Sequence, residues 1–272
     1  MFQHLTSVTA LLLAPLALAA APPGQPGRGE QALRASFYLN AVPTMVSLVG
    51  DLKKDVVDSL QLSPKANGAV EKALADHWTE KKLYALAGAA LEKQLTAGQL
   101  DAAIAQMNPE VQVMIKAGIA EADPRQAQAW LEAAKKAPDA LARQKLAARI
   151  CLHMPRPDAF KDMLGQIGEV LADIAQVTQG NDDARADLKT SLLQGMAPAL
   201  TAMADNNIMA TSAFIAYRDQ PTPNMKLLAD ALDSEPAMKL NGAAPAALVA
   251  AGKQARADLV AQLKKDLSTK KK

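Results

Sequence analysis

The placement of proline constrains the fold of this chain more than any other feature. Ten of the sixteen prolines lie where a run of apolar residues with helical spacing begins. Proline suits the first position of a helix, because the N–H group that it lacks would have no partner there, and it disrupts helix interiors. The pattern predicts separate helices that start near Pro43, Pro64, Pro109, Pro124, Pro138, Pro157, Pro198, Pro223, Pro236 and Pro245.

Capping residues support several of these starts. A hydroxyl, amide or carboxylate side chain just before a helix accepts hydrogen bonds from the free N–H groups of the first turn. Thr96 and Gln99 have the spacing of a capping box. Residues of the capping type that directly precede a proline are Ser63, Asn108, Asp123 and Thr222.

Apolar residues between the starts recur at spacings of three and four, as on one face of a helix. Aromatic residues make up only 3% of the chain, and outside the first 21 residues no alternating run favours a strand. We therefore predict an all-α fold, a multi-helix bundle of about eleven or twelve short helices. The longest stripe ends at Gly180 and comprises Phe160, Met163, Leu164, Ile167, Val170, Leu171, Ile174 and Val177.

The first 21 residues have the pattern of a cleaved signal peptide. A short apolar run from Leu11 is followed by small residues, which place cleavage after Ala19 or Ala21. Residues 22–29 are rich in Pro and Gly and are expected to form a disordered lead-in. No later apolar run is long enough to span a bilayer. These features predict a periplasmic or secreted protein without an integral membrane segment after cleavage.

The remaining chain can be read as two similar halves, residues 30–154 and 155–268, followed by a basic tail at 269–272. The segment from Leu95 to Pro109 shares an A-x-I-A pattern and a downstream proline with the segment from Ser212 to Pro223. Alanine-rich helices align easily by chance, so a single bundle of helices with similar lengths is the alternative.

Charge and cysteine content exclude some classes of protein. Lys and Arg number 30 against 28 Asp and Glu, and they are interspersed, so no basic stripe indicates a nucleic-acid partner. Cys151 is the only cysteine, and an internal disulfide is impossible. We expect Cys151 to be a buried free thiol and helix packing to provide the stability.

One group of soft or borderline ligand types, suited to copper(I) or zinc, occurs at Cys151, His153 and Met154. The spacing matches no established metal motif. The alternative, which we favour, has Cys151 facing the core and His153 near the C-terminus of a helix, where a positive charge is favourable.

A second group comprises Asp76, His77 and Glu80, with the helical spacing of an acid–base or metal cluster. Thr79 can cap a following helix, which indicates a helix junction and a solvated cluster instead. The standard nucleophile, metal and nucleotide signatures are missing. We therefore assign no catalytic, cofactor-binding or metal-binding residues and expect no cofactor.

Methionine is frequent, and eleven residues of this type could form an adaptable surface for apolar clients. Four of them lie in the apolar stripes, which favours a place in the core. These are Met45, Met107, Met163 and Met196.

Two short motifs resemble known exported proteins. Leu95 to Gln99, LTAGQ, resembles the L-T-x-x-Q motif of the Spy and CpxP group of periplasmic chaperones and stress regulators. The segment from Ser212 to Pro223 is similar to the "a-F-Y-x-S-P" helix-turn-helix of an uncharacterised family of exported proteobacterial helical domains. Its matching residues are Phe214, Tyr217, Arg218 and Pro221. Both resemblances imply an exported helical protein.

The leading hypothesis for function is non-catalytic binding in the cell envelope, of unfolded protein clients or of another envelope component. One alternative is an enzyme with an unrecognised site near His77 or near Cys151 and His153. The other is a carrier that holds a lipid or another apolar ligand between its helices, which requires a large, dry cavity.

Overall fold

The computed structural model describes residues 26–119, 127–180 and 204–268, together with residues 190, 194–195, 197–198 and 200–201. Within these ranges the chain forms twelve α-helices, one short 3₁₀ helix and no strand. The predicted all-α, multi-helix fold is confirmed. The expected signal peptide, the cap at Asp123, the start at Pro124, Met196 and the basic tail lie outside the described residues.

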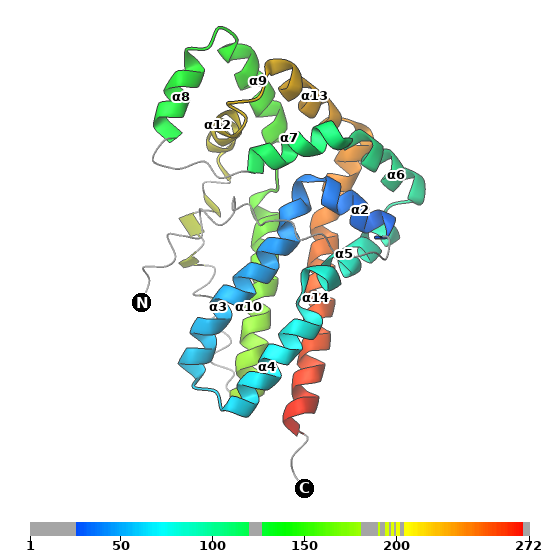
Figure 1. The fold of residues 1–272 in the computed structure, drawn as a ribbon, viewed down its shortest axis with the longest axis vertical. Helices are drawn as coiled ribbons and strands as arrows, with labels where there is room; N and C mark the ends of the chain where they lie inside the picture. Colours follow the sequence, from blue (N-terminus) through cyan, green and yellow to red (C-terminus); the bar gives the residue numbers. More distant parts are fainter. Residues whose placement is uncertain are drawn as a thin grey trace.

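The helices follow one another with short connections. In chain order they are α2 (Arg28–Ala35), η2 (Phe37–Asn40), α3 (Ala41–Leu60), α4 (Pro64–His77), α5 (Glu80–Gln94), α6 (Ala97–Gln106), α7 (Pro109–Ile119), α8 (Ala127–Lys135), α9 (Ala140–Cys151), α10 (Pro157–Gln179), α12 (Asn206–Ala216), α13 (Thr222–Leu232) and α14 (Glu235–Ser268). In Figure 1, α3, α10 and the greater part of α14 run along the long axis of the molecule. The helices α8, α9, α12 and α13 gather at one end of this axis, at the top of the view.

Seven of the ten predicted helix starts are confirmed to within two residues, including Pro43, the third residue of α3, and Pro138, two residues before α9. Pro64, Pro109 and Pro157 are the first residues of α4, α7 and α10. Pro223 and Pro236 each occupy the second position of a helix. At the far end of α10, Gly180 adopts φ +69°, the left-handed conformation that lets glycine end a helix.

The predicted caps are confirmed at three positions. The side chains of Ser63 and Asn108 accept from Ala66 N–H and Val111 N–H, at 3.3 and 3.0 Å. Thr96 and Gln99 form the complete capping box.

The prediction for Thr222 is wrong. Thr222 is already the first residue of α13, and its hydroxyl donates to the Asp139 carboxylate before α9 instead of accepting from its own helix.

Pro245 does not start a helix, contrary to the prediction. α14 runs through it for 34 residues, so the last helix is not short. The proline removes one backbone hydrogen bond, to the carbonyl group of Asn241. Packing offsets this cost, because Ala244, Ala247 and Leu248 on the surrounding turns are fully buried.

The expected lead-in ends earlier than predicted. Arg28 and Gly29 already belong to α2, and Gly29 is buried. The reason is a close crossing of α2 and α5, in which a Cβ atom at Gly29 would lie 2.1 Å from the Gly88 carbonyl oxygen. Only glycine allows the two backbones to approach this closely.

The larger of two apolar clusters, the main core, gathers buried side chains from α2, α3, α4, α5, α6, α10 and α14. It contains the long stripe predicted on α10, from Phe160 to Ile174, and the methionines Met45 and Met163. Trp78 is buried in this core, and its Nε1 atom donates to the Met45 carbonyl oxygen at 3.1 Å.

The smaller cluster, the second core, draws on α7, α9, α12 and α13 and includes Met107. Met45, Met107 and Met163 are thus core residues, as predicted. Helices from both sides of residue 154 contribute to each core. The division into halves at residues 30–154 and 155–268 therefore does not correspond to the two cores.

No helix in the described part of the chain is long and apolar enough to cross a membrane.

Candidate functional site

His77 lies at the end of α4 and contacts α14. Its Nε2 atom is 2.6 Å from Gln262 Oε1, and Gln262 Nε2 donates to Asp76 Oδ2 at 2.8 Å. The Nδ1 atom is buried and has no hydrogen-bond partner. One ring nitrogen is therefore bonded and the other faces the interior, so proton transfer to a ligand would require the Gln262 bond to break.

The expected cluster of Asp76, His77 and Glu80 is divided by a helix junction. α4 ends at His77, and the Thr79 hydroxyl caps α5 by accepting from Lys82 N–H at 3.2 Å. Asp76 and Glu80 are exposed, as a solvated cluster requires. The structure adds Gln262, 185 positions after His77, which no local pattern indicates.

A groove of about 460 Å³ lies between α4 and α14 beside His77. Ion pairs cross it or flank it, with Lys72 Nζ 3.8 Å from Asp266 Oδ2 and Lys82 Nζ 3.3 Å from Asp258 Oδ2. The groove is charged and open, which is unlike the dry apolar cavity that a lipid carrier needs. Its lining residues are Lys72, Asp76, His77, Asp258, Ala261, Gln262, Lys265 and Asp266.

Cys151, His153 and Met154 follow one another around the end of α9 but have different environments. Cys151 is half-buried and not fully buried as expected. It packs with Met154 against the second core, and this partial burial raises the pKa of its thiol. His153 contacts Asp233, with 2.6 Å between Nε2 and Oδ1. Across the residues that the structure describes, no group of three or more His, Cys, Asp or Glu side chains is arranged to hold a metal ion.

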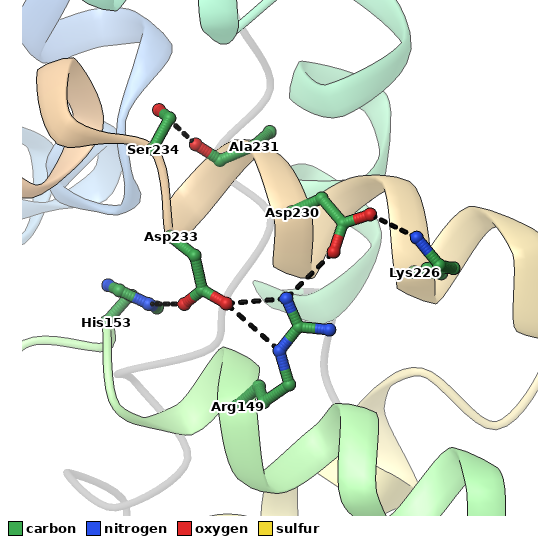
Figure 2. A network of polar contacts seen from close by, with 7 residues as sticks. All are labelled: Arg149, His153, Lys226, Asp230, Ala231, Asp233 and Ser234. Carbon is green, nitrogen blue, oxygen red and sulfur yellow. Dashed lines mark hydrogen bonds and ion pairs between the residues drawn. The ribbon is translucent and has the colours of Figure 1, made fainter.

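Figure 2 shows the polar network that His153 joins, between the ends of α9 and α13. Arg149 Nη2 is 2.8 Å from Asp230 Oδ1 and 2.5 Å from Asp233 Oδ2, and Arg149 Nε donates to the same Asp233 oxygen at 3.0 Å. Lys226 pairs with the other oxygen of Asp230. The network ties the two helices together at their C-terminal ends, where cations are favourable.

The carboxylates of this network are held in their charged form. Burial raises the pKa of Asp233, but hydrogen bonds from Arg149 and His153 outweigh it and leave the pKa below its usual range. Hydrogen bonds from Lys226 and Arg149 lower the pKa of Asp230. Sequence reasoning missed Arg149, Asp230 and Asp233, because more than 80 residues separate Arg149 from the two aspartates.

Arg143, on the buried side of α9, fixes the turn between α12 and α13. Its guanidinium group donates to the carbonyl oxygens of Tyr217, Arg218 and Gln220 at 2.9, 2.6 and 2.8 Å. The bonded carbonyls follow the C-terminus of α12, where acceptors lack helical partners.

The "a-F-Y-x-S-P" residues have structural contacts in the same region. Phe214 and Tyr217 are buried in the second core. Arg218 lies over the Trp130 ring, 3.9 Å from its centroid, and Pro221 directly precedes α13. The residues that match the "a-F-Y-x-S-P" pattern therefore have structural roles, in core packing and in the turn before α13.

The opposite side of α9 faces solvent with two leucines, an alanine and a lysine. Leu141 and Leu152 are 66% and 68% exposed, and Lys145 and Ala148 between them are also exposed. Leu146, Ala147 and Ile150 of the same helix are buried in the second core. We call the exposed set Leu141, Lys145, Ala148 and Leu152 the α9 outer face.

Comparison with known proteins gives no match: no protein-family model, no curated protein and no solved structure is similar to this chain.

Proposed function

We propose that this chain is an exported, non-catalytic helical protein that binds a protein segment, from an unfolded client or another envelope component, at the α9 outer face. The main observation in support is that Leu141 and Leu152 are 66% and 68% exposed on a helix whose other side is packed into the second core. Export rests on the signal-like pattern of residues 1–21.

The packing of α9 supports a binding role. Its buried side is anchored by Leu146 and Ile150 in the second core and by Arg143 on the α12–α13 turn. The Arg149 network fixes its C-terminal end to α13. Apolar side chains on a scaffold held this firmly can be buried by a partner with little loss of conformational entropy.

The environments of the histidines and the cysteine favour binding over catalysis. His77 and His153 are bonded to Gln262 and Asp233. The raised pKa of Cys151 disfavours the thiolate that a nucleophile needs. Each histidine therefore has a partner within the fold at Nε2, and Cys151 packs against the second core.

The test uses the mature protein and a double variant, Leu141→Ser with Leu152→Ser. The probe is α-lactalbumin that has been reduced so that it unfolds and aggregates. We expect the wild-type protein at equimolar concentration to suppress aggregation. We expect the double variant to lose at least about tenfold in affinity for the labelled client, because burial of each leucine contributes about 1.5–3 kcal/mol.

The matched control is Val113→Ser. Val113 is 66% exposed but lies on α7. This variant should protect the client as the wild type does, and thermal unfolding should show that all three proteins are folded. Absence of protection by the wild type, or equal protection by all three proteins, would refute client binding at this face.

A further inference from the structure

The α9 outer face has the residue spacing of one side of a coiled coil. Leu141, Lys145, Ala148 and Leu152 follow at intervals of four, three and four residues. This is the spacing by which two helices pack along a shared seam. Leu152 continues the helical path, with φ −63° and ψ −21°, so the seam extends about 16 Å, or three turns.

The chemistry of the seam is uneven along its length. Leucines lie at both ends, and the small Ala148 leaves room for a side chain from a partner helix. A lysine at one seam position of a coiled coil selects register and partner, because its charge must be matched across the interface.

Lys145 provides such a charge. α9 carries Arg143, Lys145 and Arg149 and no acidic residue. Arg143 donates to three backbone carbonyl groups, and Arg149 donates to the carboxylates of Asp230 and Asp233. Lys145 forms no ion pair or hydrogen bond within the part of the chain that the structure describes.

We propose that the α9 outer face binds an amphipathic helix of another protein, with apolar residues at the same spacing and a carboxylate placed opposite Lys145. A second copy of this chain fits less well, since its α9 would bring another Lys145 and no acidic residue to the seam. This inference rests on the proposed function and specifies its partner.

The test is a charge exchange with two synthetic helical peptides about three heptads long. Both carry leucines at the four-three-four spacing, and they differ only in whether Glu or Lys flanks the stripe. Affinities for the wild-type protein and for Lys145→Glu are measured by fluorescence anisotropy. We expect the wild type to bind the Glu peptide about fivefold more tightly than the Lys peptide and the variant to reverse this preference.

Lys65→Glu is the matched control, because Lys65 is an exposed lysine on α4 and its replacement changes the net charge equally. It should keep the wild-type preference. The proposal is overturned if neither peptide binds, if Lys145→Glu does not reverse the preference, or if Lys65→Glu reverses it too.

Sedimentation velocity of the protein alone provides a further arm. A monomer is expected. A dimer that dissociates when Leu141 and Leu152 are replaced by Ser would assign the face to a second copy and overturn the proposal. If the double variant loses client binding but the wild type does not prefer the Glu peptide, the proposed function stands. Only the proposal of an acidic partner helix is then refuted.

Discussion

Gly29 of α2 lies against Gly88 of α5 so closely that neither position has room for a side chain. A Cβ atom on Gly29 would lie 2.1 Å from the Gly88 carbonyl oxygen, and one on Gly88 would lie 2.6 Å from the Glu30 backbone nitrogen. The two obstructing atoms belong to the backbone and cannot rotate away. The start of the described chain is therefore fixed to the main core through α5 by this crossing.

Replacement of Gly29 by Ala should lower the free energy of unfolding by about 1–3 kcal/mol, because the helices must separate to admit the methyl group. Urea denaturation measures the change. Gly68→Ala is the control, since Gly68 lies in α4 with open space around its Cα atom. That substitution should increase stability by about 0.5–1 kcal/mol through helix propensity. A neutral Gly29→Ala would show that the crossing is loose.

Arg256 on α14 joins two acidic residues of α10. Its Nη1 and Nε atoms lie 3.2 Å from Glu169 Oε2 and 3.0 Å from Asp173 Oδ2, and only 10% of the Asp173 side chain is exposed. Arg256→Ala should cost about 2–4 kcal/mol, because it leaves poorly hydrated carboxylates without this cation. Lys239→Ala, which breaks the exposed pair with Glu235, should cost less than about 1 kcal/mol. Equal losses in thermal or urea unfolding would contradict the assignment.

Local signals in the sequence predicted the helices well. Proline at positions 64, 109 and 157, the capping box of Thr96 and Gln99, and Gly180 each act within one helical turn. Their effect on the backbone does not depend on distant contacts, so they can be read without the fold. The failures at Gly29 and Pro245 have the opposite cause, because packing against remote helices decided both conformations.

The proposed binding region could be predicted only in part. The spacing of Leu141, Lys145, Ala148 and Leu152 is visible in the sequence, but the apolar residues on the other side of α9 are equally regular. Only the fold shows which side is covered. Likewise His153 suggested a metal site with Cys151, whereas its partner is Asp233, 80 residues later.

The lowered pKa of Asp233 predicts a dependence of stability on pH. A carboxylate with a folded-state pKa below its unfolded value stabilises the fold at pH values above the unfolded pKa, and this contribution is lost as the pH falls through the folded pKa. The wild type should exceed Asp233→Asn by at most about 1 kcal/mol at neutral pH, since the side chain is 40% exposed. The difference should shrink below about pH 4.

The control for this prediction is Arg149→Gln, which removes the main cation beside Asp233. In that background, Asp233→Asn should have a smaller effect on the urea midpoint at neutral pH. An unchanged effect would mean that Arg149 does not stabilise the charged carboxylate.

Pro245 gives the last prediction, because it lies inside α14, where its missing N–H group costs the helix one backbone hydrogen bond. The side-chain oxygen and nitrogen of Asn241, one turn earlier, are also buried without partners. Pro245→Ala restores an N–H group to the Asn241 carbonyl and should raise the free energy of unfolding by about 1 kcal/mol. Pro236→Ala, at the second position of the same helix, should leave stability within about 0.5 kcal/mol, since no hydrogen bond is gained there. Lower stability of Pro245→Ala in urea would show that the ring packs too well in the main core, or restricts the unfolded chain too strongly, for the new hydrogen bond to compensate.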